Sequence, residues 1–300
     1  MKQIAYPFHR LLAAAVLSVG ASLAANGASA HTQTNFAWDW QDRDVARVMA
    51  LGGSCNRCEL SGRNLSGATF TGASFISATL VGANLRGAEL VGSNFSNSDF
   101  SRADLQGIEI VGATFANATF TGAVMRGAEA RGANFVNASM ERVDLSSAEL
   151  FGVNLRGADL NHANLRDSEL YGATLANVNA SGASFRAASL TAANLDSGNF
   201  SGAAFQDADL SSTRFGSGNF RGADFRGADL SRADIRGADL SRVRNLTQDQ
   251  VSEACGDGST RLPRGLSVSA CRGRIIRPPA PPAPPAPPPP VRRFAQAAAN

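Results

Sequence analysis

Residues 221–230 read Arg-Gly-Ala-Asp-Phe-Arg-Gly-Ala-Asp-Leu, which is one five-residue unit written twice in succession. The same unit extends in both directions, because every fifth residue from Leu60 to Leu240 is the centre of a copy, and 31 of these 37 centres are Leu or Phe. Ala stands two residues before the centre in 25 of the 37 copies, and Gly often stands two residues after it. No insertion or deletion breaks the register, so the repeat decides the fold.

A period of five fits neither an α-helix nor a flat strand. Within one unit, however, the Ala and the Leu or Phe are two residues apart, so in an extended backbone both face the same side. We expect the recurring Gly to supply a turn at a place where a side chain would obstruct the bend. Five-residue sides that all turn in one direction close into coils, and the coils stack as a solenoid that buries the apolar residues between neighbours.

The composition of the 300 residues agrees with this prediction. Hydrophobic residues make up 44% of the chain, but many of them are Ala, and Leu, Ile, Val and Phe together account for only about a fifth. That is close to the level at which a chain cannot bury enough apolar surface to fold. The composition therefore argues against a conventional globular enzyme core and more strongly against a packed helical bundle, and the regular placement of the large apolar residues favours a narrow solenoid over disorder.

The unit resembles the repeat of the pentapeptide-repeat family, Ala-(Asp/Asn)-Leu followed by two variable residues. The resemblance covers residues 55–245 and implies an all-β fold, a right-handed quadrilateral parallel β-helix with short helical caps and with four repeats in each coil. Residues four repeats apart should then stack. We expect two such columns of phenylalanine, one formed by Phe75, Phe95, Phe115 and Phe135 and the other by Phe185, Phe205 and Phe225.

The segment 1–30 has the order of a secretory signal peptide. A cationic start is followed by an apolar stretch from Leu11 to Val19 and by Ala28-Ser29-Ala30, which predicts cleavage after Ala30. The apolar stretch is short for a membrane span, so an uncleaved anchor is the weaker alternative, and we expect no transmembrane span after cleavage. The predicted location is the periplasm or the medium of a bacterium.

The predicted segments are a signal peptide at 1–30, an N-terminal cap at 31–54, the solenoid at 55–245, a C-terminal cap at 246–272 and a disordered tail rich in Pro and Arg at 273–300. In the first cap, residues 42–51 predict a short helix, and Trp38 and Trp40 are expected to cover the first coil, with ligand stacking as the alternative. In the second cap, Thr247 to Gln250 form a capping box that opens a helix running to about Ala254. This stretch resembles a C-terminal extension of exported proteobacterial members of the family.

The chain has four cysteines, and an even number in an exported protein suggests disulfides. A zinc site, a redox pair and free thiols are the alternatives, because Cys55 and Cys58 have the spacing of a zinc half-site. In the rod that the resemblance implies, Cys55 and Cys58 lie at the opposite end from Cys255 and Cys271. We therefore expect two structural disulfides, Cys55 with Cys58 and Cys255 with Cys271.

No catalytic or cofactor motif is recognisable, and we expect no catalytic residue, no cofactor and no metal. Ser and Asp are frequent because the repeat requires them, so their abundance carries no catalytic information. After cleavage only His31 and His162 remain as histidines. His162 falls on an outward position of the repeat, and His31 would be a new N-terminus, where copper chelation is a minor alternative to a plain surface residue.

The charges of the chain are unevenly placed. Residues 55–245 carry 17 Arg and 19 acidic residues, and their alternation predicts a self-paired, solvated surface. Residues 261–300, by contrast, hold seven Arg and no acid, and Pro278 to Pro290 contain only Pro and Ala, which predicts a stiff polyproline II spacer.

We therefore predict a non-enzymatic, exported binding or structural scaffold of the bacterial envelope. Its expected partner is an envelope protein or an anionic envelope polymer that meets the basic tail. No nucleic acid is expected, and a homodimer through one end of the solenoid is an open alternative. Two other functions remain as alternatives. One is a DNA-mimicking protein that binds gyrase, the best-known activity that the family resemblance implies, and the other is a carbohydrate-active β-helix.

Overall fold

The structure is a computed structural model, and it describes residues 53–271. The signal peptide, the helix expected at 42–51 with the two tryptophans, and the tail beyond Cys271 lie outside the described residues. Among the described residues, no helix is long and apolar enough to cross a membrane.

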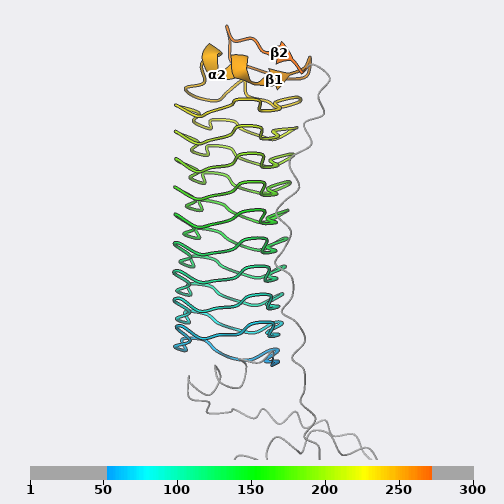
Figure 1. Ribbon diagram of the computed structural model, residues 1–300. Helices are drawn as coiled ribbons and strands as arrows, with labels where there is room; N and C mark the ends of the chain where they lie inside the picture. Colours follow the sequence, from blue (N-terminus) through cyan, green and yellow to red (C-terminus); the bar gives the residue numbers. More distant parts are fainter. Residues whose placement is uncertain (1–52, 272–300) are drawn as a thin grey trace, which may run out of the picture. The chain divides into compact units, whose positions relative to one another are not determined.

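The described chain winds into coils that are stacked on one another (Figure 1). Parallel bridges join the residue just before each centre to the equivalent residue four repeats later. They run from the pair Ser54 and Ser74 to the pair Asp224 and Arg244. Backbone hydrogen bonds link neighbouring coils along the stack, as when the N–H of Leu60 donates to the Thr79 carbonyl at 2.7 Å. Four five-residue units therefore make one coil, as the resemblance predicts.

Each unit ends in a tight turn. In the turn after Leu60, for example, the N–H of Arg63 donates to the Leu60 carbonyl at 3.2 Å, and Gly62 has a φ of 65°. A positive φ at the third residue of such a turn is characteristic of type II. The same left-handed conformation occurs at every fifth residue from Arg57 to Gly237.

The expected reason for the turn glycines is wrong. A Cβ placed on Gly62 or Gly67 would meet nothing within 4 Å, and Asn97 and Ser147 occupy the same position in other units. At most turn glycines, therefore, space does not exclude a side chain. At Gly157, Gly182 and Gly227 a Cβ would meet a side chain of the adjacent coil, which would have to move aside. Gly is favoured because the left-handed region costs other L-residues about 1–2 kcal/mol, a cost that is smaller for Asn and Asp.

The interior is filled by the centre residues and by the small residues that precede them. The predicted phenylalanine columns are confirmed: the rings of Phe75 and Phe95 stack with centroids 4.7 Å apart, and those of Phe185 and Phe205 at 5.1 Å. The stacks continue to Phe135 in the first column and to Phe225 in the second. Each coil thus adds one layer to a continuous, narrow apolar core.

The C-terminal end of the stack is covered by helix α2 (Gln248–Glu253) and by the short parallel strands β1 (Cys255–Gly256) and β2 (Ser269–Ala270). The predicted helix and its capping box are confirmed, because Thr247 and Gln250 hydrogen-bond reciprocally at the start of α2. The Gln250 side chain also donates to the carbonyls of Phe225 and Ala228 at 2.8 and 2.7 Å. The cap therefore satisfies backbone groups that the last coil would otherwise expose.

Candidate functional site

One side of the coil stack carries glutamate in five consecutive coils. The five residues lie four repeats apart and each is bridged to the next through the backbone, so their side chains project from one column: Glu89, Glu109, Glu129, Glu149 and Glu169. A second outward column stands two residues after the glutamates and consists of Val91, Val111, Arg131, Phe151 and Tyr171. We call these two columns, with the turn glycines that follow them at 92, 112, 132, 152 and 172, the glutamate face.

The second column of the glutamate face is mainly apolar and only partly covered. Val91, Val111, Phe151 and Tyr171 are half-buried, whereas the centre residues of the same units are fully buried. The glycine column beside them carries no side chain, and a Cβ placed on Gly92 or Gly132 would meet nothing within 4 Å. The apolar side chains therefore lie between a row of carboxylates and a row of bare backbone.

Arg131 is the single cation in these columns between residues 89 and 172. Its Nε donates to Glu149 Oε2 at 3.0 Å, and its guanidinium carbon lies 5.7 Å from the centroid of the Phe151 ring. The hydrogen bond and the charge of Glu149 raise the pKa of Arg131, and the charges of Glu129 and Glu109 raise it further. The carboxylates thus combine into one negative field along the face.

The remaining carboxylates of the column have few contacts. Glu89 accepts a hydrogen bond from Thr69 at 3.3 Å, while no side chain of residues 53–271 hydrogen-bonds or ion-pairs with Glu109, Glu129 or Glu169. Elsewhere on the stack arginines pair with acids of the adjacent coil. Examples are Arg86 with Asp104 at 3.2 Å, Arg126 with Asp144 at 2.6 Å and Arg214 with Asp196 at 2.6 Å.

The expected self-paired surface is therefore confirmed on other sides and wrong for the glutamate face. The sequence contains the information needed to find this face, because Glu recurs at every fourth repeat from 89 to 169. Counting charges along the chain hides this pattern, since neighbours in sequence point to different sides of the coil.

A hollow of about 250 Å³ lies on another side, near the C-terminal cap, and is lined by Asp196, Arg214, Gly216, Asp234, Arg236 and Asp257. Its carboxylates all have partners within the hollow or beside it. Arg214 pairs with Asp196 as described, the Nε of Arg236 donates to Asp234 at 2.8 Å, and Asp257 accepts from the Ser259 hydroxyl at 2.6 Å. The hydrogen bond from Ser259 is the main cause that lowers the pKa of Asp257 to about 2. Each of these carboxylates is thus engaged with a partner, although burial raises the pKa of Asp196.

A second hollow, of about 230 Å³, lies near the same end and has a different charge. It is lined by Asn219, Arg221, Asp239, Ser241, Arg242 and Arg261. Three arginines and one aspartate line it, and Arg261 Nη1 lies 3.7 Å from Asp239 Oδ2. The hollow therefore has an excess of positive charge.

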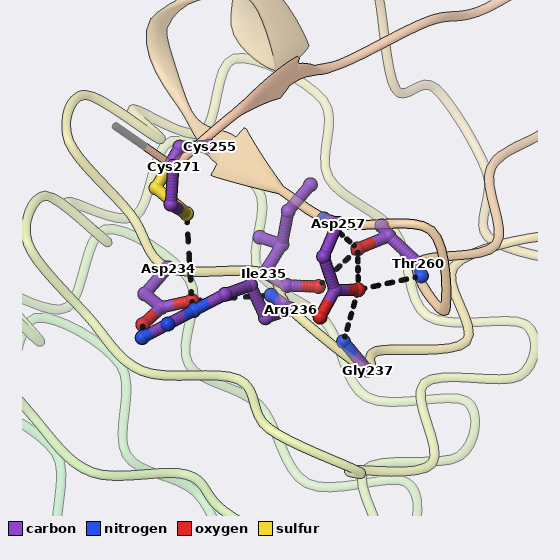
Figure 2. The surroundings of a disulfide bond; sticks show 8 residues. All are labelled: Asp234, Ile235, Arg236, Gly237, Cys255, Asp257, Thr260 and Cys271. Carbon is purple, nitrogen blue, oxygen red and sulfur yellow. Dashed lines mark hydrogen bonds and ion pairs between the residues drawn. A yellow bond between two sulfur atoms is a disulfide. The ribbon is translucent and has the colours of Figure 1, made fainter. Parts of the chain in front are cut away.

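The structure brings both expected cysteine pairs together. Cys55 and Cys58 are bonded with their Cα atoms 5.4 Å apart, and Cys255 and Cys271 with theirs 4.8 Å apart, so no cysteine is free. Figure 2 shows the second bond above Asp234, whose Oδ1 is 3.9 Å from the Cys271 sulfur.

This arrangement bears on the zinc alternative. Asp234 and the two sulfur atoms lie within 4.8 Å of one another, as metal ligands would. A thiolate is needed to bind zinc, however, and both sulfurs are consumed by the disulfide, so the oxidised cluster does not fit a metal. His162 is exposed on a turn, as predicted, and His31 lies outside the described residues.

Comparison with known proteins identifies the repeat. The family model described as Pentapeptide repeats matches the chain in eight copies, within residues 54–90, 80–115, 108–146, 148–186, 168–207 and 203–242. No curated protein matches the chain.

Among solved structures, the chain is similar to HetL of the cyanobacterium Nostoc sp. strain PCC 7120, a pentapeptide repeat protein involved in regulating heterocyst differentiation. The two are 26% identical, the match covers 72% of this chain and 97% of HetL, and the TM-score is 0.54. The match to QnrB1, a plasmid-mediated fluoroquinolone resistance protein, has 22% identity and a TM-score of 0.28, and covers 69% of this chain and 94% of that one. The repeats span well over half of the sequence, and this chain belongs to the pentapeptide-repeat family.

Proposed function

We propose that this protein is an exported, non-enzymatic scaffold that binds an anionic polymer of the bacterial envelope through its basic C-terminal end. The observation that carries the proposal is the hollow whose lining contains three arginines, Arg221, Arg242 and Arg261, but only one carboxylate, that of Asp239. Guanidinium groups bind phosphate and carboxylate through paired hydrogen bonds, which suits lipopolysaccharide, anionic lipid or a cell-wall polymer.

The sequence from Arg261 to the end of the chain is also positively charged. Residues 261–300 contain seven arginines and no acid. Many arginines of the coils are already paired with carboxylates of adjacent coils, as at Arg86 and Arg126. Positive charge without acidic residues nearby in the sequence is therefore concentrated in residues 261–300, and this is the part that we expect to meet a polyanion.

Export is supported by the order of charged, apolar and small residues in segment 1–30 and by the two disulfides, which are typical of oxidising compartments. Membership of the family supports the right-handed, quadrilateral form of the coil. A binding or structural role, rather than catalysis, agrees with the family and with the partnered acids of the hollow around Asp234.

A gyrase binder that imitates DNA is the second candidate function, and the glutamate face is the observation that favours it. A row of carboxylates at the spacing of the coils is a regular negative surface. Against it stands the near balance of charge in residues 55–245, with 17 Arg and 19 acids, because the other sides are not acidic. Inhibition of DNA supercoiling by gyrase in the presence of the purified protein would establish this candidate.

The carbohydrate-active alternative requires a cleft lined by acids that lack arginine partners. The hollow around Asp234 does not meet this requirement, because Arg214 and Arg236 neutralise Asp196 and Asp234. An envelope protein as partner, and a homodimer through one end of the solenoid, stay predictions that pull-down and light scattering can test.

The test of the main proposal is sedimentation of the purified protein with lipopolysaccharide vesicles and with isolated peptidoglycan. Three proteins are compared with the full chain: a truncation after Arg272, the variant Arg221→Gln/Arg242→Gln, and the control Arg86→Gln/Arg126→Gln on another side. We expect the truncation and the hollow variant each to lose binding at least threefold and the control to bind as the full chain does. Equal binding by all four proteins, or binding by none, would overturn the proposal.

Export is tested separately by fractionating cells and sequencing the N-terminus of the protein. We expect a periplasmic or secreted protein that begins at His31. Recovery from the cytosol with residues 1–30 intact would refute export and favour the gyrase-binding candidate.

A further inference from the structure

The glutamate face presents an extended binding surface that no other part of residues 53–271 covers. Its apolar column includes Phe151 and Tyr171 in adjacent coils, both half-buried, and the glycine column beside them leaves these side chains accessible from one flank. The carboxylates of Glu109, Glu129 and Glu169 on the other flank have no ion-pair partner among the described residues. A ligand for this face must therefore be long, apolar along its length and cationic.

We propose that the C-terminal segment of the same chain, residues 272–300, binds along the glutamate face. This segment contains five arginines, at 272, 274, 277, 292 and 293, and no acid, whereas the face has five glutamates and one arginine. Between the arginine clusters, the stretch from Pro278 to Pro290 contains only Pro and Ala. The segment thus has the charge, the length and the apolar character that the face requires.

The repeat distance of the proline-rich segment also matches the distance spanned by two coils of the glutamate face. A polyproline II helix has three residues per turn and rises ~3.1 Å per residue, so one turn advances about 9.3 Å. Parallel strands lie ~4.7 Å apart, so two coils of the stack advance about the same distance. The sequence Pro-Pro-Ala recurs from residue 278 to 286 with a period of three. Each turn of the segment therefore meets an equivalent pair of coils, and its proline rings can pack on the apolar column, as proline-rich segments pack on aromatic side chains elsewhere.

The attachment point lets the segment reach the face. Cys271 is held by its disulfide to Cys255, and the cap covers the end of the side of the stack that carries the glutamate face, because the Ser231 hydroxyl donates to Glu253 of α2 at 2.7 Å. Ser231 belongs to the same column as Tyr171, three coils further along the chain. From the cap to Glu89 is about eight coils, or roughly 40 Å, and residues 272–293 can extend to about 65 Å at the rise of polyproline II.

This inference goes beyond the proposed function, since it assigns the segment a partner within its own chain. If the segment also binds an envelope polymer, the glutamate face competes for the same arginines. The two ideas are nevertheless separable, because the contact within the chain needs no polymer.

The test is photo-crosslinking of the purified full chain with Tyr171→p-benzoylphenylalanine. The matched control is Ser181→p-benzoylphenylalanine, which stands at the corresponding outward position two repeats further along the chain. We expect position 171 to crosslink to peptides from residues 278–293 and position 181 to give at least fivefold less. Equal yields from the two positions, or no crosslink to the segment from 171, would overturn the proposal. If the variant at 171 is misfolded by circular dichroism, Val111→p-benzoylphenylalanine replaces it.

Two further measurements identify the occupant and the forces. Isotopically heavy and light protein are mixed before irradiation; crosslinks within one isotope form are expected, and mixed crosslinks would show that a second copy supplies the segment. In a second comparison, Glu109→Gln/Glu129→Gln is expected to lower the yield from position 171 at least threefold, while the control Glu59→Gln/Glu141→Gln leaves it unchanged. An unchanged yield in the first variant would refute the role of the glutamates. Because no polymer is present, these results do not depend on the polymer-binding test.

Discussion

Gly198 lies so close to the ring of Phe200 that a Cβ on the glycine would stand 2.5 Å from a ring carbon. Gly198 occupies the small inward position of its unit, where Ala is the usual residue, and its φ is not in the left-handed region. The ring of Phe200 stacks on that of Phe220 with centroids 5.1 Å apart, which limits how far it can move aside. The ring of Phe200 thus occupies the space that an alanine methyl group at position 198 would need.

The first prediction follows from this contact. Gly198→Ala restores the residue that the repeat favours, yet we expect it to destabilise the protein by about 1–3 kcal/mol, the usual effect of overpacking a core. Chemical denaturation followed by circular dichroism measures the change. In a Phe200→Leu background, Gly198→Ala should cost much less than it does in the unmodified protein, because the shorter side chain vacates the space. A stabilising effect of Gly198→Ala alone would contradict the packing argument.

The second prediction concerns one substitution at two positions of the unit centred on Phe185. Ala187 is held at a φ of 53°, whereas Ala183 faces the core and is fully buried. Replacing Ala187 by Gly relieves the strain of the left-handed region but raises the conformational entropy of the unfolded chain. We therefore expect the free energy of unfolding to rise by at most about 1 kcal/mol. Ala183→Gly should instead destabilise by about 1 kcal/mol or more, because it also loses a buried methyl group. The same measurement serves for both variants, and equal effects would show that turn strain does not explain the preference for Gly.

Much of the fold is predictable because one short period controls it. The spacing of Leu, Phe and Ala predicts the coil, and counting four repeats onward predicts the stacking of Phe75 on Phe95. The capping box at Thr247 predicts α2 because the hydrogen bonds involved are local in sequence.

Features that depend on neighbouring coils are less accessible from the sequence. The glutamate face appears only when every fourth repeat is compared, because Glu109 and Glu129 belong to different coils. The role of Gly198 and the hollow beside Gly216 depend on side chains from more than one unit or coil, and a five-residue repeat carries no information about them. The repeat thus determines the backbone, whereas the surface is determined by individual departures from it.

The third prediction compares the two disulfides. Cys255 and Cys271 are 16 residues apart in sequence and Cys55 and Cys58 only three. In the chain-entropy account, a bond that closes a longer loop stabilises more, by about 3 kcal/mol for a loop of about 15 residues. We therefore expect Cys255→Ala/Cys271→Ala to lower the free energy of unfolding by more than Cys55→Ala/Cys58→Ala does.

Hydrogen exchange locates the effect of the C-terminal bond. Because each coil of a solenoid contacts only its neighbours, loss of the bond should increase exchange in β1 and β2 and leave the coils around Phe115 protected. A uniform increase along the whole chain would show instead that the bond stabilises the stack globally. An equal loss of stability in the two double variants would contradict the argument from loop length.

The last prediction concerns acid stability of the C-terminal cap. Asp257 accepts hydrogen bonds from the Ser259 hydroxyl at 2.6 Å and from the Gly237 N–H at 3.3 Å, which joins the cap to the last coil. These bonds lower the pKa of Asp257 from 3.8 to about 2 in the folded protein. A carboxylate with a lowered folded-state pKa stabilises the fold above its unfolded-state pKa, and this contribution is lost as the pH falls. We expect the loss for Asp257 between about pH 4 and pH 2.

Thermal unfolding at a series of pH values from 2 to 6 measures this dependence. In Asp257→Asn the part of the stability that titrates between pH 4 and pH 2 should be smaller than in the unmodified protein, because an amide does not ionise. Asp167→Asn is the matched control: Asp167 is exposed on a turn, and its carboxylate makes no hydrogen bond with the described residues. The control should keep the pH dependence of the unmodified protein. If Asp257→Asn and the unmodified protein lose stability in parallel as the pH falls, the contact between Asp257 and Gly237 does not stabilise the cap.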